Sequence, residues 1–135
     1  MTGPTRIAAG PGRPLVLVYG VLAVAATARS VVQVLRDFDA APLAYGLSLL
    51  AAVVYVLATV ALAREWRTVA WAAVTTEAVG VVAVGALSLA RPDLFPDATV
   101  WSGFGAGYGL VPLVLPFLGM WWLGRTAAPR ARSGR

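Results

Sequence analysis

The chain contains no cysteine, no histidine and no lysine among its 135 residues. Without cysteine it has no disulfide, no thiolate nucleophile and no cysteine-ligated metal. Without histidine it lacks the commonest metal ligand and the usual proton shuttle near neutral pH. No phosphate-binding loop, dinucleotide fingerprint, zinc motif or Ser/His/Asp set is present. We therefore expect no enzyme, no bound cofactor and no metal centre.

Charge is also scarce, because charged residues make up 13% of the chain while hydrophobic residues make up 59%. A soluble domain is closer to half apolar and a quarter charged, and a chain this short cannot bury so much apolar surface. Its mean hydropathy of +0.78 indicates an integral membrane protein. The net charge of +5 comes from arginines that flank apolar runs. This pattern predicts the lipid bilayer as partner and no nucleic acid.

Four apolar stretches reach the length of about 20 residues that a membrane-spanning helix needs. The connections between them are short, which makes consecutive helices antiparallel. The predicted fold is therefore an all-α membrane protein, an antiparallel four-helix transmembrane bundle covering 15–124. The tails are 1–14 and the arginine-rich 125–135. The four predicted spans are about 15–35, 43–63, 69–90 and 100–123.

The distribution of arginine predicts the orientation of the spans, since cytoplasmic loops carry the excess of basic residues. Eight arginines lie in the two tails and the middle loop, whereas the other two loops hold only Arg36 and Arg91. We expect an inner (cell) membrane protein with both termini cytoplasmic and Trp101 near the outer interface. In an alternative reading the first span is a cleavable signal peptide with a site at Ala26-Thr27-Ala28. The apolar pattern, however, continues to Leu35.

Two ionisable residues lie inside the predicted spans, Arg29 in the first and Glu77 in the third. Charges in a span are costly and are functional candidates by default. Their depths differ by about 9 Å at 1.5 Å per residue, which a long arginine side chain can bridge. Three interpretations follow: an ion pair that fixes helix register, an arginine directed to lipid headgroups beside a protonated glutamate, or a carboxyl that exchanges a proton or cation during transport.

The second span carries a polar stripe at helical spacing that includes Tyr45, Ser48 and Tyr55. Such a stripe indicates either hydrogen bonds between helices or the wall of a polar cavity. Gln33, one turn beyond Arg29, is a further cavity candidate.

The fourth span combines glycines, a tyrosine and two prolines in one stretch. Staggered GxxxG pairs allow close helix packing and favour a homo-oligomer or a partner membrane subunit. Pro112 and Pro116 each remove a helix hydrogen bond, so Tyr108 and the freed carbonyls belong either to a kinked packing helix or to a site or hinge. The paired glycines are Gly103, Gly105, Gly107 and Gly109.

In size and helix number the chain resembles the small multidrug exporters, which also carry a lone membrane glutamate. Theirs lies in the first helix, whereas Glu77 lies in the third and the characteristic sequence around it is absent. Two functions are consistent with these features. One is a small-solute or ion transporter or channel that uses Glu77 and Arg29. The other is a non-catalytic scaffold or accessory subunit of a larger membrane complex.

Overall fold

The structure, a computed structural model, describes residues 6–37, 39, 42–95, 99 and 101–126. Within this part of the chain every regular element is helical. Three helices are long and apolar enough to cross a membrane, and there are up to four spans if a bent helix pair counts as one. The predicted all-helical class is confirmed. The three long helices are α1 (Gly12–Asp37), α2 (Pro42–Ala63) and α3 (Arg67–Ala90).

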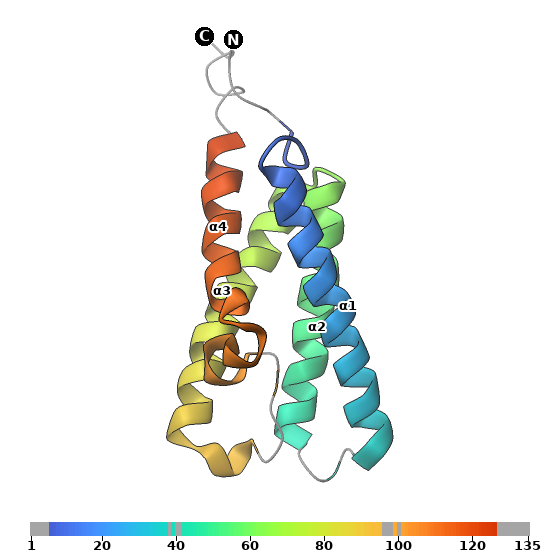
Figure 1. Cartoon of the computed structure of the whole chain (residues 1–135), viewed down its shortest axis with the longest axis vertical. Helices are drawn as coiled ribbons and strands as arrows, with labels where there is room; N and C mark the ends of the chain where they lie inside the picture. The colour runs from blue at the N-terminus through green and yellow to red at the C-terminus, as the bar shows by residue number, and fades with distance from the viewer. Residues whose placement is uncertain (1–5, 38, 40–41, 96–98, 100, 127–135) are drawn as a thin grey trace.

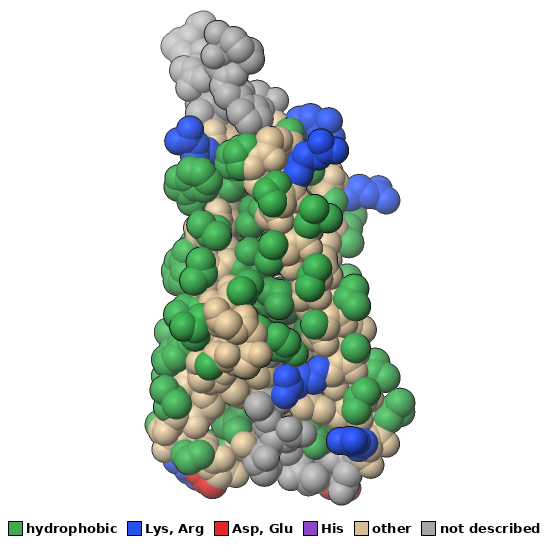
Figure 2. Space-filling model, viewed as in Figure 1, with side chains coloured by type: hydrophobic (Ala, Val, Ile, Leu, Met, Phe, Trp, Pro, Cys, Tyr) green, Lys and Arg blue, Asp and Glu red, His purple; other side chains and the backbone are tan. Residues whose placement is uncertain are grey.

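Large apolar side chains cover the outer surface of these helices. Leu35 is 79% exposed, Val24 72% and Leu17 69%. Figure 2 shows an apolar band across the face in view, with arginines toward both ends of the molecule. Water-soluble monomers rarely expose continuous apolar surface on this scale. The outer surface is therefore suited to lipid.

The helices run up and down beside one another, and α1 begins at the same end of the molecule at which the last helix ends (Figure 1). α1 packs along α2, and α2 packs along α3. The turn between α2 and α3 is tight, with Glu65 in a left-handed conformation at φ 61°. Proline at the first position of α2 costs no hydrogen bond, because the first amides of a helix have no partner within it.

The predicted continuous span over 100–123 is wrong. The chain forms a short coil, η3 (Ser102–Tyr108), and then α4 (Val111–Thr126), and the two are bent by 97°. Gly103, Phe104 and Gly105 inside η3 have φ values of +59°, +61° and +83°. A right-handed helix cannot continue through three such residues, and glycine makes this conformation accessible.

The coil η3 packs against α3 and takes the place of the first half of the predicted fourth span, whereas α4 forms the second half (Figure 1). A short turn, η2 (Pro92–Leu94), follows α3 at the far end. The outer parts of the two predicted tails, 1–5 and 127–135, lie outside the described residues, and so do the arginines at 130, 132 and 135.

Candidate functional site

Glu77 lies at the centre of a polar cluster inside the helical core. It is 0% exposed, and so is Tyr19. The Tyr19 hydroxyl on α1 donates a hydrogen bond of 2.6 Å to Glu77 Oε1 on α3. The second carboxyl oxygen, Oε2, has no hydrogen-bond partner. A fully buried carboxyl with one free oxygen is uncommon, because buried polar groups are normally satisfied.

Tyr55 and Trp101 extend this cluster to two more parts of the chain. Trp101 Nε1 donates to the Tyr55 hydroxyl at 3.0 Å. The Tyr55 ring lies 6.3 Å from the Tyr19 ring and 6.3 Å from the Trp101 ring, measured between centroids. The Tyr55 hydroxyl also lies near the Glu77 carboxyl. The site therefore joins α1, α2, α3 and the start of the coil.

Two glycines give this cluster its close packing. A Cβ atom added at Gly80 of α3 would lie 2.5 Å from the Trp101 ring, so the ring lies directly on the helix backbone. A Cβ atom at Gly119 of α4 would lie 3.3 Å from the Tyr19 hydroxyl. Trp101 is thus 1% exposed and buried in the core. Its expected place near the outer interface is wrong, because the chain folds back into the core at this residue.

The ion pair between Arg29 and Glu77, one of the three interpretations, is not present in the structure. Arg29 instead donates from Nη1 to the Tyr108 hydroxyl at 3.2 Å, and its guanidinium carbon lies 5.9 Å from the centre of the Tyr108 ring. Counted from the starts of α1 and α3, Arg29 is about 26 Å along its helix and Glu77 about 15 Å along its own. The coil places Tyr108 within reach of the guanidinium, and the difference in depth favours this nearer partner.

The remaining cavity and hinge candidates are divided between the core and the coil. Gln33 is 5% exposed on α1, and the buried hydroxyls of Ser30 and Ser48 have no hydrogen-bond partner. Pro112 lies in the first turn of α4, where a missing amide costs no helix hydrogen bond. The carbonyl that we expected Pro112 to free, that of Tyr108, lies before α4 begins. Pro116 lies inside α4 and is buried.

The four glycines do not form the expected packing face. Gly103, Gly105 and Gly109 all have positive φ, so they belong to the coil and its end. Gly107 has no neighbour that a side chain would meet within 4 Å. A GxxxG contact needs both glycines on one face of a continuous helix. The structural role of these glycines is to allow the left-handed turns, above all at Gly105, which packs against Pro112.

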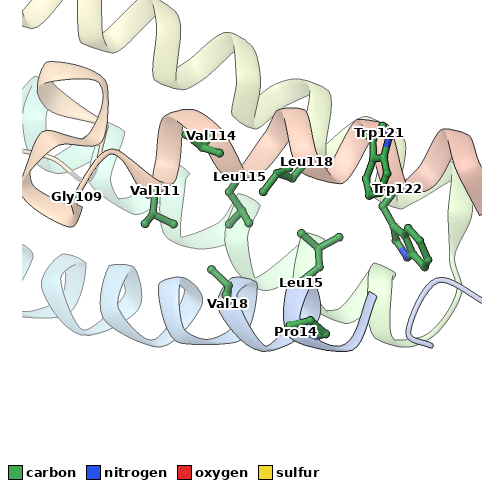
Figure 3. A pocket seen from close by; sticks show the side chains of 10 residues that line it. All are labelled: Pro14, Leu15, Val18, Gly109, Val111, Val114, Leu115, Leu118, Trp121 and Trp122. Atoms are coloured by element: carbon green, nitrogen blue, oxygen red, sulfur yellow. The ribbon is translucent and has the colours of Figure 1, made fainter. Parts of the chain in front are cut away.

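An apolar groove runs between α1 and α4 toward the coil (Figure 3). Its larger part has a volume of about 460 Å³ and extends from Val111 to Trp121 and Trp122. A second hollow of about 360 Å³ adjoins it, since Val18 and Val111 line both, and Tyr108 lies at its wall. Of the cavity candidates, Tyr108 is therefore the one that lines this groove.

The end of the helical core at which α1 begins and α4 ends is closed by a clamp, a set of hydrogen bonds that the sequence did not indicate. Glu65 accepts hydrogen bonds from the backbone amides of Ile7 at 2.6 Å and Ala8 at 3.0 Å. Trp122 Nε1 donates to the Ile7 carbonyl at 2.7 Å. Arg67 donates to the Leu123 carbonyl at 3.1 Å. Ile7, 0% exposed, is thereby buried at this end.

In the loop after α3, Arg91 forms a two-pronged ion pair with Asp93 at 3.0 and 2.9 Å. The hydrogen bonds from Arg91 hold the pKa of Asp93 below its ordinary value of 3.8. Among the described residues no three acidic side chains gather to hold a metal ion.

Two residues of the site, Tyr19 and Trp101, were not predicted as functional. The one available signal for Tyr19 was a phenol in an otherwise apolar stretch, at a depth within one turn of Glu77. Comparison with known proteins yields no matching family model, curated protein or solved structure. The proposal below therefore rests on the geometry of the site.

Proposed function

We propose that this protein is a small multi-pass transporter of the inner membrane in which Glu77 takes up and releases a proton. The observation that carries the proposal is the fully buried Glu77 carboxyl, bound by Tyr19 through one oxygen and without a partner on the other. No arginine of the described chain forms an ion pair with it. An ionised carboxylate is costly in such surroundings, so loss of its proton requires water or another cation to replace it.

The broken span next to the site supports this function. Transporters commonly place their sites where a helix is interrupted, because the irregular backbone can rearrange there. Here the residue just before the coil, Trp101, is hydrogen-bonded to Tyr55 in the Glu77 cluster. Its three consecutive left-handed residues provide a hinge close to the carboxyl. Movement of the coil would uncover the cluster and allow the proton to exchange.

The arginine distribution supports the proposed orientation, with both termini in the cytoplasm. In this frame the clamp of Glu65 on Ile7 lies at the cytoplasmic end. The ion pair of Arg91 with Asp93 lies at the outer end. Glu77 is about 15 Å along α3 from its first residue, near the middle of a hydrocarbon layer about 30 Å thick.

The second candidate function is that of a scaffold or accessory subunit in a larger membrane complex. The observation that favours it is that the groove between α1 and α4 is separate from the Glu77 cluster. None of the residues that line the groove belongs to that cluster. In this reading Tyr19, Tyr55 and Glu77 only hold the helices in register. Self-association of the chain or contact with a partner subunit would then be its principal activity.

Proton flux in liposomes tests the two functions against each other. Wild type is compared with Glu77→Gln, which keeps the size of the side chain and removes the exchangeable carboxyl. Thr76→Val is the matched control, because Thr76 is on the same helix and its hydroxyl bonds only its own backbone at Ala72. Helical content and oligomeric state must be equal in all three samples before flux is compared.

The transport proposal expects a pH-sensitive dye inside the vesicles to report gradient-driven proton movement for wild type and Thr76→Val, and none for Glu77→Gln. Candidate solutes are added in turn, as inorganic cations and as cationic dyes. Wild-type vesicles that are no more permeable than empty ones under every condition would refute the transport proposal and favour the scaffold. Normal flux through Glu77→Gln would remove Glu77 from the mechanism.

A further inference from the structure

The groove between α1 and α4 reaches Tyr108, and the Tyr108 hydroxyl contacts Arg29, a cation that has no acidic partner among the described residues. Arg29 is half-buried, and both its side-chain hydrogen bond and its ring contact are to one uncharged residue, Tyr108. None of the ion pairs among the described residues includes it. A guanidinium in a hydrocarbon layer is costly unless an anion accompanies it. The position of Arg29 therefore favours an anionic ligand at this end of the groove.

The rest of the groove is lined by apolar side chains, as Figure 3 shows for Val111, Val114 and Leu118 on α4. From Val111 to Trp122 it follows α4 for about 16 Å at 1.5 Å per residue, which is close to the thickness of one leaflet. Its two adjoining parts, about 460 and 360 Å³, each fall in the size range of small-molecule sites. Such a groove fits an extended hydrocarbon chain.

We infer that this groove binds a single-chain amphiphile with a carboxylate head, a long-chain fatty acid, with the carboxylate on Arg29 and Tyr108 and the chain along α1 and α4. A guanidinium presents two parallel donors that match the two oxygens of a carboxylate. The Tyr108 hydroxyl can donate a further hydrogen bond to the same group. This site goes beyond the proposed proton exchange at Glu77 and is carried by different residues.

The depth of Arg29 selects this ligand over a glycerophospholipid. Arg29 lies eight residues before the end of α1 at Asp37, about 12 Å inside that end of the helix. Its side chain leans toward the start of α1, as helical side chains do, and is held there by Tyr108. A phospholipid would have to draw its whole headgroup to this depth, whereas a carboxylate is the smallest anionic head that can follow.

A second copy of the chain is a poorer occupant of the groove. To neutralise Arg29 it would have to present an acidic side chain at this depth. The only acidic residue within the spans is Glu77, and it is 0% exposed. An apolar helix from a second copy would cover the groove and leave the guanidinium without an anion.

Electron spin resonance of spin-labelled stearic acid in reconstituted membranes tests the site. The methyl ester of the same labelled chain is the uncharged probe. The measurement is made at pH 9, where the free carboxyl is ionised. We expect wild type to bind the acid in preference to the ester, with a ratio of motionally restricted acid to restricted ester of about ten or more. One or two hydrogen bonds to a charged group provide a ratio of this size. Arg29→Gln should bring this ratio close to one.

Two further variants keep the test independent of Arg29. Val114→Phe fills the groove and should abolish the preference, whereas Val53→Phe, at a 56% exposed position on α2, should leave it unchanged. Equal restriction of acid and ester by wild type overturns the inference. So does a preference that survives Arg29→Gln, or one that labelled phosphatidylglycerol matches. A change of oligomeric state in Val114→Phe with no loss of preference would assign the groove to a second copy.

The outcomes separate this site from the proposed function. Glu77→Gln should retain the preference for the acid, because Glu77 does not line the groove. Preserved selectivity without proton flux in wild type would refute transport and leave the binding site standing. Proton flux without selectivity would refute the binding site alone.

Discussion

Substitution of Gly80 by alanine tests the position of Trp101 in the core, on which the description of the broken span depends. An alanine Cβ would lie 2.5, 2.6 and 3.0 Å from three carbon atoms of the Trp101 ring. Contacts this short do not persist, so the ring must move. Trp101 is 1% exposed and donates a hydrogen bond to Tyr55, which the movement would lengthen or break.

The cost of this substitution combines three contributions. Overpacking in a core costs about 1–3 kcal/mol. A hydrogen bond between membrane helices contributes about 0.6 kcal/mol. Alanine is a better helix former than glycine by about 1 kcal/mol, which offsets part of the loss. We expect Gly80→Ala to lower the free energy of unfolding by about 1–2 kcal/mol.

Unfolding of the purified protein in mixed micelles with increasing SDS, followed by circular dichroism, measures this free energy. Gly46→Ala on α2 is the matched control, because the added Cβ would have no neighbour within 4 Å beyond the adjoining residues and backbone of its own helix. It should leave stability unchanged or raise it by up to about 1 kcal/mol.

A double substitution shows whether Trp101 is the cause. In a Trp101→Leu background the ring is absent, so Gly80→Ala should lose its cost and behave like the control at Gly46. The two changes should therefore be non-additive by about 1–3 kcal/mol. If Gly80→Ala is as stable as Gly46→Ala in the wild-type background, Trp101 does not lie on α3 and the reasoning is refuted.

Three other perturbations have expected outcomes. Tyr19→Phe removes the donor to the buried carboxyl and should lower stability by about 1 kcal/mol in the same SDS titration, whereas an unchanged midpoint would mean that this hydrogen bond contributes nothing. Glu65→Gln leaves one oxygen in place of the two that accept hydrogen bonds from the amides of Ile7 and Ala8. Loss of one such bond should make exchange of the amide protons in that segment about tenfold faster, as measured by mass spectrometry. Unchanged exchange rates would exclude the clamp. Arg91 lowers the pKa of Asp93, so the stability from this exposed pair is present above the ordinary pKa of Asp93 and is lost as pH falls through the lowered value. Asp93→Asn should remove this acid-side dependence from a pH titration of stability. An unchanged dependence would rule out the pair as its source.

The three long helices could be recognised from the sequence because their cause is local. In hydrocarbon every backbone amide and carbonyl must be satisfied within its own segment, so a run of about 20 apolar residues is helical whatever surrounds it. The first three predicted ranges, 15–35, 43–63 and 69–90, begin within three residues of α1, α2 and α3. Glu77 and Arg29 could likewise be identified, since a charged residue within an apolar run can be recognised from the sequence alone.

The fourth span shows the limit of that argument. The residues at 100–123 are apolar enough to cross a membrane, but Gly103, Gly105 and Gly109 permit left-handed backbone as readily as they permit close helix packing. Composition does not distinguish the two outcomes. The choice is made by packing, because Trp101 fits against Gly80 and Phe104 against Gly85 when the chain folds back on α3.

The sequence by itself determined the solvent of this protein, its helical class and the two charged residues within its spans, all of which follow from local composition. Only the tertiary structure decided which groups those charges meet. Glu77 binds Tyr19, and Arg29 binds Tyr108. Partner choice depends on the depth and rotation of each helix against its neighbours, and these are set by contacts between residues far apart in the chain. The Tyr108 partner exists only because the fourth span is broken, which carries its hydroxyl to the guanidinium.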